Sequence, residues 1–186
     1  NKDRNTYVFC RGILKFLLGF YLDCSPHDIK ISKNENNKPI INSSNSHIYF
    51  NQSHSYKKAI FAFSKNLDLG VDIEYIRKLE NINEMGKRMF YKDYLNKFNT
   101  LSEENKRHVY FSHWTLKEAY FKTIGIKLSK IRIINNIMFN FFNSNYLEKI
   151  KIYRYNYNQI NCLKYLNFNI DNEYYSSLCF IEKTIQ

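Results

Sequence analysis

Three short segments of this chain combine side chains that can bind phosphate, hold a metal or move a proton. Residues 50–55 read Phe-Asn-Gln-Ser-His-Ser, and residues 70–74 read Gly-Val-Asp-Ile-Glu. Residues 114–122 read Trp-Thr-Leu-Lys-Glu-Ala-Tyr-Phe-Lys. Hydroxyl, imidazole, carboxylate and ammonium groups therefore recur within 75 residues of one another, which makes these segments the first candidates for a functional site.

The second segment places two acidic residues, Asp72 and Glu74, two positions apart. Residues i and i+2 of a strand share one face, so both carboxylates would project from the same side. Neighbouring carboxylates repel each other, and a bound divalent cation relieves that repulsion. Hard oxygen ligands favour Mg²⁺ or Mn²⁺ over zinc. The alternative is an ordinary half-exposed strand whose outer residues happen to be charged.

The third segment has helical spacing. Trp114, Glu118 and Lys122 stand at i, i+4 and i+8, so they lie along one stripe of a helix. The alternative is an amphipathic helix with a surface Glu–Lys pair, which would add only a few tenths of a kcal/mol. Neither carboxylate segment decides a function by itself, and the order of all three segments carries more information.

Taken together, the segments resemble the signatures of the Sfp-type 4'-phosphopantetheinyl transferases. Those signatures are F-N-x-S-H-S, G-[IV]-D-[IV]-E and W-x-x-K-E-A-x-x-K, and all three occur here in the same order. An upstream Lys38-Pro39 also matches the family, so the resemblance covers about residues 38–125. A glycine usually follows S-H-S in the family, whereas this chain has Tyr56.

The resemblance implies an enzyme that transfers the phosphopantetheine arm of coenzyme A to a serine of an apo carrier protein. Adenosine 3',5'-bisphosphate is the second product. By resemblance, Asp72, Glu74 and Glu118 would hold Mg²⁺ on the pyrophosphate of coenzyme A, with Mn²⁺ as an alternative. By the same resemblance, Glu118, directly or through a metal-held water, is the expected base for the serine proton.

The same resemblance implies a set of phosphate contacts. Lys122 would stabilise the leaving phosphate. Ser53 and His54 would contact the 3'-phosphate or nearby oxygens, Lys38 would add another contact, and Arg11 a further one. The expected catalytic residues are thus Glu118, Lys122 and Asp72, and the expected coenzyme A contacts are Arg11, Lys38, Ser53, His54 and Lys122.

The composition bears on partners. The 186 residues carry a formal net charge of +11, which indicates a polyanionic partner. The charge is spread along the chain without a polybasic run, which argues against a nucleic-acid footprint. Carriers in the resembled chemistry are typically acidic, so the surplus would speed their encounter. Two alternatives stay open: a basic module that binds single-stranded nucleic acid with its aromatic strands, and a non-catalytic relative that binds coenzyme A.

Hydropathy and cysteine content bear on location. No run approaches the roughly 20 apolar residues of a membrane span, and no signal peptide is recognised. The four cysteines, Cys10, Cys24, Cys162 and Cys179, are widely separated, which predicts reduced and mostly buried thiols. We therefore expect a cytoplasmic protein without a membrane partner, although an upstream segment could redirect it to an organelle.

Periodicity and turn residues predict the elements that must position these side chains. Helices are expected over residues 4–22, 82–98 and 103–124, the last with Ser102 as N-cap and Gly125 as C-cap. Strands are expected over residues 28–32, 47–50, 58–63, 69–74, 131–142, 148–157 and 174–182. Residues 33–47 are expected to form a loop, and residues 50–55 to be polar residues between two strands.

This order of elements predicts an α+β fold. The resemblance adds a pseudo-twofold arrangement of two similar α+β halves, with coenzyme A in the cleft between them. We place the halves at residues 1–73 and 74–186 and expect one compact unit. Members of the resembled family are usually monomers, and we expect a monomer here.

Overall fold

The computed structural model describes residues 2–42, 48–90, 92–125, 150–151 and 163–181. The elements follow in the order α1 (Lys2–Leu22), β1 (Ile31–Lys33), β2 (Pro39–Ile41), β3 (Tyr49–Ser55), β4 (Lys58–Ser64), β5 (Asp68–Tyr75), α2 (Ile82–Met89), α3 (Lys92–Asn99), α4 (Glu103–Ile124), β6 (Ile150–Lys151), β7 (Leu163–Asp171) and β8 (Tyr174–Ile181). The predicted α+β class is confirmed.

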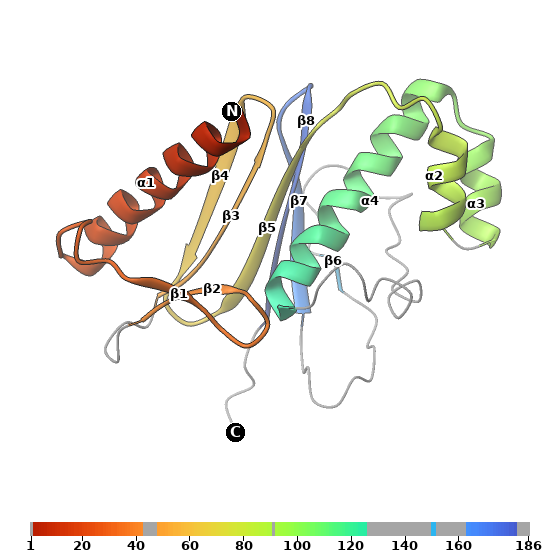
Figure 1. The fold of residues 1–186 in the computed structure, drawn as a ribbon. Helices are drawn as coiled ribbons and strands as arrows, with labels where there is room; N and C mark the ends of the chain where they lie inside the picture. Colours follow the sequence, from red (N-terminus) through yellow and green to blue (C-terminus); the bar gives the residue numbers. More distant parts are fainter. Residues whose placement is uncertain (1, 43–47, 91, 126–149, 152–162, 182–186) are drawn as a thin grey trace.

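The strands form three antiparallel groups. β5, β8, β7 and β6 make a four-stranded sheet in that order, while β3–β4 and β1–β2 are hairpins. In the ribbon, β4, β3, β5 and β8 run side by side, with α1 flanking the hairpin and α4 flanking the larger sheet (Figure 1). β3 packs beside β5, yet the two strands belong to different ladders.

Each long helix covers its own strands through an apolar stripe. On α1, Leu14 and Leu18 are fully buried against Phe50 of β3. On α4, Leu116 and Ala119 are fully buried in a cluster with strand residues of β7 and β8. Since α4 carries the third motif, this packing fixes the height of its polar residues above β5.

The ends of α4 lie where the sequence predicts them. The Ser102 side chain accepts a hydrogen bond from the Asn105 N–H at 3.2 Å. Gly125 ends the helix with φ +70°, a left-handed conformation that glycine adopts without a steric penalty. The whole third motif therefore lies inside one continuous helix.

Several boundaries differ from prediction. Residues 50–55 continue strand β3 and pair with β4 from Tyr49↔Ser64 to Ser55↔Lys58, so they do not lie between strands. A hydrophobicity pattern does not predict this strand, because its alternate polar side chains face β5 and not an apolar core. The predicted loop over residues 33–47 contains β2, which pairs with β1.

The helix predicted over residues 82–98 is two helices. α2 ends at Met89, and the extended backbone of its C-cap Phe90 (φ −113°, ψ 147°) breaks the helical path before α3. Strand β7 was not predicted, whereas β8 was. The strand predicted over 131–142 lies outside the described residues, and of 148–157 only 150–151 are described.

Two further sequence expectations concern thiols and membranes. The three cysteines that the structure describes are free, Cys10 and Cys179 buried and Cys24 exposed. Over the described ranges, no helix has both the length and the apolar character that a bilayer crossing requires.

Candidate functional site

A polar side-chain ladder joins β3 to β5 where a backbone ladder is missing. Asn51 Oδ1 accepts from the Val71 N–H at 3.0 Å, and Ser55 Oγ accepts from the Tyr75 N–H at 3.1 Å. Between them, Ser53 Oγ donates to the Asp72 carboxylate at 2.7 Å. The spacing of two residues on β3 places all three side chains on one face, so the first motif is the strand that holds the second.

Asp72 lies at the centre of this ladder. Its side chain is buried, and Lys122 Nζ reaches it from α4 at 2.7 Å. Burial raises the pKa of Asp72, while the ammonium of Lys122 and the Ser53 hydroxyl oppose that rise. Oδ2 of Asp72 is buried without a hydrogen-bond partner in the described part of the chain. An unpaired buried carboxylate oxygen is costly, which makes it a ready acceptor for a cation.

Lys122 is fully engaged in this structure. Besides Asp72, its ammonium donates to Ser53 Oγ at 3.0 Å and to the Val71 carbonyl at 3.2 Å. An ammonium group has three N–H donors, so these three acceptors use them all. Contact with a phosphate oxygen would therefore require Lys122 to release one of these partners.

Glu74, the second acidic residue of the strand, is held by neighbours on both sides. Its Oε2 accepts from Ser55 Oγ at 3.1 Å and from Arg77 Nη1 at 3.4 Å. Its side chain is 21% exposed, compared with 5% for Asp72. Asp72 is therefore the buried carboxylate of the pair, and Glu74 is the one nearer the surface.

Glu118 lies on α4, one turn before Lys122. The pKa of its carboxyl is raised to about 7: burial is the main cause, the charges of Asp72 and Glu74 also raise it, and Lys122 lowers it. These couplings bring the three predicted carboxylates into one electrostatic cluster. Within the described residues, however, no three acidic, histidine or cysteine side chains lie close enough to hold a metal ion as they stand.

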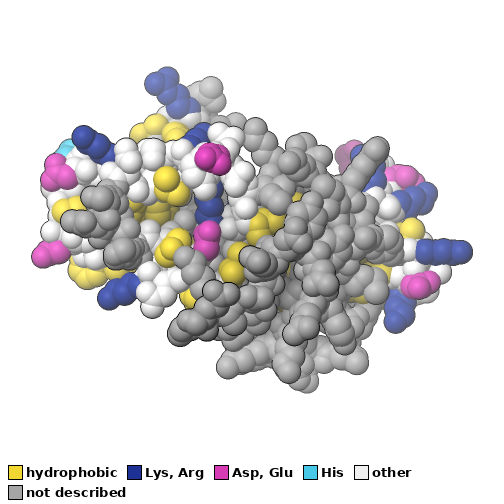
Figure 2. Space-filling model, turned by 90° about the horizontal axis from the view of Figure 1, so that it is seen from below, with side chains coloured by type: hydrophobic (Ala, Val, Ile, Leu, Met, Phe, Trp, Pro, Cys, Tyr) yellow, Lys and Arg dark blue, Asp and Glu magenta, His cyan; other side chains and the backbone are white. Residues whose placement is uncertain are grey.

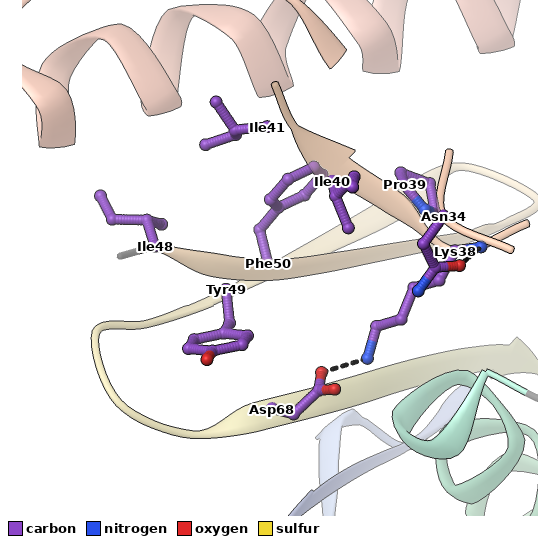
Figure 3. A pocket seen from close by; sticks show the side chains of 9 residues that line it. All are labelled: Asn34, Lys38, Pro39, Ile40, Ile41, Ile48, Tyr49, Phe50 and Asp68. Carbon is purple, nitrogen blue, oxygen red and sulfur yellow. Dashed lines mark hydrogen bonds and ion pairs between the residues drawn. The ribbon is translucent and has the colours of Figure 1, made fainter. Parts of the chain in front are cut away.

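Lys38 lies at the other end of β5. Its buried ammonium pairs with Asp68 and donates to the carbonyls of Leu69 at 3.0 Å and Thr123 at 2.9 Å. It thereby ties β2, β5 and the end of α4 together. Figure 3 shows Lys38 and Asp68 pointing toward one another beside a cavity of about 270 Å³. The cavity is otherwise lined by Asn34, Pro39, Ile40, Ile41, Ile48, Tyr49 and Phe50.

Two other predicted phosphate contacts lie apart from the ladder. His54 is exposed and, as the neighbour of Ser53 and Ser55 on a strand, projects to the opposite face of β3. Arg11 donates from α1 to the Ile31 carbonyl at 3.4 Å. The structure therefore gathers Ser53, Asp72 and Lys122 directly and couples Glu74 and Glu118 to them, whereas Lys38, His54 and Arg11 lie outside this cluster.

Sequence reasoning missed Asn51, Ser55 and Lys117. The first two are rungs of the ladder, and their period of two was visible once residues 50–55 are treated as a strand. Lys117, inside the third motif, donates to the Met89 carbonyl at 2.9 Å, and burial lowers its pKa to about 8. This hydrogen bond joins α4 to α2. The two residues are far apart in the chain, so no local sequence pattern could predict the contact.

The described surface carries both signs of charge. Figure 2 shows acidic and basic side chains interspersed on the face seen from below. This arrangement agrees with the even spread of charge along the sequence.

The fold and the carboxylate cluster agree with the outcome of sequence comparison. The sequence pattern of the 4'-phosphopantetheinyl transferase superfamily matches residues 68–179, from β5 to β8. This match spans more than half of the chain, and the chain belongs to that superfamily. The predicted resemblance is therefore confirmed, and the matched range contains the second and third motifs.

Two relatives found by sequence comparison support the same assignment. The 4'-phosphopantetheinyl transferase HetI of Nostoc sp. is 33% identical over 135 residues, which cover 72% of this chain and 57% of HetI. The 4'-phosphopantetheinyl transferase gsp of Aneurinibacillus migulanus is 30% identical over 113 residues, 61% of this chain and 45% of gsp. The chain thus spans about half the length of the curated relatives it matches.

Proposed function

We propose that this protein transfers the 4'-phosphopantetheine arm of coenzyme A to a serine of an apo carrier protein. The observation that carries the proposal is the buried Asp72 carboxylate, held by Ser53 and Lys122 and electrostatically coupled to Glu118. Superfamily membership supports the reaction class. A cluster that combines three carboxylates, one of them buried, with the ammonium group of Lys122 suits a pyrophosphate substrate and its counter-ion.

The donor set fits a hard divalent cation. Asp72 offers a buried oxygen without a hydrogen-bond partner among the described residues, and Glu74 and Glu118 supply further carboxylates. We propose that these three residues hold Mg²⁺, or Mn²⁺ in its place, and that at least one of them moves closer when the ion binds. When bound, the ion neutralises charge on the pyrophosphate as the phosphoanhydride bond breaks.

The chain's own residues supply the proton transfer and the anion contact. The serine oxygen of the carrier attacks the phosphorus that bears the pantetheine, and the bond to the other phosphate of the pyrophosphate breaks. Glu118 would take the serine proton. Its pKa of about 7 describes the site without a cation, and a bound divalent ion would lower it. Lys122 then releases one of its three present acceptors and donates to the departing phosphate of adenosine 3',5'-bisphosphate.

We further propose that the nucleotide end of coenzyme A lies along β3 toward β2. Ser53, His54, Lys38 and Arg11 remain the proposed contacts, of which Lys38 also lines the cavity shown in Figure 3. The proposed boundary between the pseudo-twofold halves, residues 1–73 and 74–186, falls within β5 (Asp68–Tyr75), a few residues beyond the seam between β3 and β5. A helix-covered hairpin on one side and a helix-covered sheet on the other support this division.

The proposal is tested by mass spectrometry of the carrier. The protein is incubated with coenzyme A, Mg²⁺ and a panel of apo carriers from fatty-acid, polyketide and peptide synthesis. We expect at least one carrier to gain the mass of a single phosphopantetheine group, and we expect chelation of Mg²⁺ to prevent the gain. Unchanged mass across the whole panel would contradict the proposal. Calorimetric binding of coenzyme A without turnover would identify a non-catalytic relative.

A further inference from the structure

The carboxylate of Asp72 is anchored through only one of its two oxygens. Ser53 Oγ and Lys122 Nζ both donate to Oδ1, each at 2.7 Å. The other oxygen, Oδ2, is buried and has no hydrogen-bond partner in the described ranges. One serine of β3 and one cation therefore hold the first oxygen of this carboxylate and leave the second open.

The same arrangement recurs at Glu74, two residues further along β5. Ser55 Oγ donates to Oε2 at 3.1 Å, and Arg77 Nη1 donates to the same oxygen at 3.4 Å. No described residue donates to Oε1 of Glu74. A serine of β3 and a cation again hold one oxygen, and the two serines are two residues apart on their strand, as the two carboxylates are on theirs.

Both cations also contact helix α4, which lies along β5 (Figure 1). Lys122 belongs to the last turn of α4, and the guanidinium of Arg77 lies 5.3 Å from the ring centroid of Phe111, a buried residue of the same helix. Phe111, Glu118 and Lys122 stand at i, i+7 and i+11, so they share one stripe of α4. Along the helix, Glu118 therefore lies between the position that packs on Arg77 and the position that pairs with Asp72.

The hydroxyl of Ser55 has a fixed direction. It accepts from the Tyr75 N–H at 3.1 Å, and its single proton is donated to Glu74. An anchored oxygen stops the carboxylate from rotating, so the other oxygen is already oriented when a ligand arrives. Partners of this kind orient the side chains that bind metals, and their loss typically costs about 10–100-fold in metal affinity or activity.

We propose that Ser55 is a positioning residue for Glu74, and that together with Arg77 it keeps Oε1 of Glu74 available to the divalent cation. Ser53 and Lys122 do the same for Oδ2 of Asp72. This inference rests on the proposed function. It gives Ser55 a role that acts through Glu74, without contact to coenzyme A or to the serine of the carrier.

Binding of Mn²⁺ to two variants provides the test. Ser55→Ala removes the hydroxyl, and Ser55→Thr keeps it on a side chain that suits a strand. Each protein is titrated with Mn²⁺ in the presence of coenzyme A and without carrier, and the free ion is measured by electron paramagnetic resonance against a titration without protein. We expect the Mn²⁺ Kd to rise about tenfold or more in Ser55→Ala and to stay within about twofold of the parent in Ser55→Thr.

The dependence of transfer on Mg²⁺ separates positioning from folding. In Ser55→Ala, the Mg²⁺ concentration that gives half the maximal rate of carrier modification should rise about tenfold. The rate at saturating Mg²⁺ should return close to that of the parent, because the ion then fills the site again. A variant damaged only in its folding would be slower at every Mg²⁺ concentration.

Ser64→Ala is the matched control. The Ser64 hydroxyl accepts from the N–H groups of Asn66 and Leu67 at 3.3 and 3.0 Å, at the end of β4 remote from Ser55, so its loss should leave the Mn²⁺ Kd unchanged. Equal Mn²⁺ affinity of Ser55→Ala and the parent would overturn the positioning role while transfer by the parent persists. A loss that Ser55→Thr does not restore would also overturn it. If the parent binds no Mn²⁺ and modifies no carrier, the proposed function itself fails, and the positioning role with it.

Discussion

The ammonium of Lys122 lies 2.7 Å from the Asp72 carboxylate, and this ion pair joins the middle of β5 to the last turn of α4. Both groups belong to different motifs, 50 residues apart in the chain. The pair therefore has two functions, one in holding the helix on the strand and one in setting the charge of the proposed site. Substitutions can separate these two functions.

The first prediction concerns the structural function of Lys122. Lys122→Met leaves the Asp72 carboxylate buried without its cation, and we expect a loss of about 3 kcal/mol in the free energy of unfolding. Adding Asp72→Asn should recover part of this loss, because the uncompensated charge is then removed. Urea denaturation of both single variants and the double variant measures the coupling. Strictly additive losses would mean that the pair contributes nothing to folding.

The second prediction concerns the chemical function of Asp72. Asn has nearly the shape of Asp and can still accept from Ser53, so Asp72→Asn should unfold within a few degrees of the parent protein. It cannot supply a carboxylate to a cation, and transfer to the carrier should fall by about 100-fold or more. Carrier mass shift measured beside a thermal melt separates the two effects. Full activity of the variant would remove Asp72 from the proposed metal ligands.

The third prediction concerns the close approach of α4 to β5. A Cβ at Gly70 would lie 2.2 Å from the Ala119 carbonyl oxygen and 2.4 Å from the Thr123 nitrogen. Both are backbone atoms that cannot rotate away, so Gly70→Ala must displace the helix that carries Glu118. We expect a loss of about 2 kcal/mol or more together with loss of transfer.

Gly12→Ala is the matched control for Gly70→Ala. A Cβ at Gly12 meets no atom within 4 Å, and the residue lies in the interior of helix α1. Alanine is favoured over glycine by roughly 0.5–1 kcal/mol inside a helix, so this variant should be slightly more stable than the parent. Equal behaviour of the two alanine variants in urea denaturation would contradict the packing argument.

The sequence predicted those parts of the site that depend on local patterns, such as strand alternation and helix capping. Asp72 and Glu74 follow from strand alternation, and α4 follows from Ser102, Gly125 and the apolar stripe between them. The link from Ser53 to Asp72 was not predictable, because it joins two strands that share no backbone ladder. The same holds for Lys38, whose partners lie 30 to 85 residues away.

The fold shows the same limit. The break between α2 and α3 falls at Phe90, where the backbone turns extended so that Phe90 can pack on Phe98 at 4.9 Å between ring centroids. The residues on both sides of the break have helical periodicity, so the sequence predicts one continuous helix. Tertiary packing at Phe90 overrides that local preference. The sequence also did not predict strand β7. This strand is defined by its pairing with β8, and its residues do not show a clear alternation of apolar and polar side chains.

The last prediction concerns acid sensitivity and His113. Its ring is buried against Phe90 and Tyr94, at 5.0 and 5.2 Å between ring centroids. Nδ1 lies 2.7 Å from the Val109 carbonyl, which can only accept, so Nδ1 carries the proton of the neutral ring. The pKa of His113 is lowered from 6.5 to about 3: burial is the main cause, Lys117 adds to the shift, and the Val109 carbonyl opposes it.

The unfolded chain therefore takes up a proton at His113 below its ordinary pKa, while the folded protein does not. This contribution to stability is complete above about pH 6.5 and declines as the pH falls toward 3, by up to about 1.4 kcal/mol per pH unit. The raised pKa values of Asp72 and Glu118 act in the opposite direction. A comparison with a His113 variant is needed to isolate the histidine.

His113→Phe keeps an aromatic ring in the same pocket and removes the titrating group. Urea denaturation of the parent and the variant at several pH values between about 7 and about 5 measures the two slopes. The parent should lose more free energy of unfolding than the variant across this window, whatever their difference at neutral pH. Parallel slopes would mean that the His113 ring takes up a proton equally readily in the folded and unfolded states, and that its burial does not make the fold acid-sensitive.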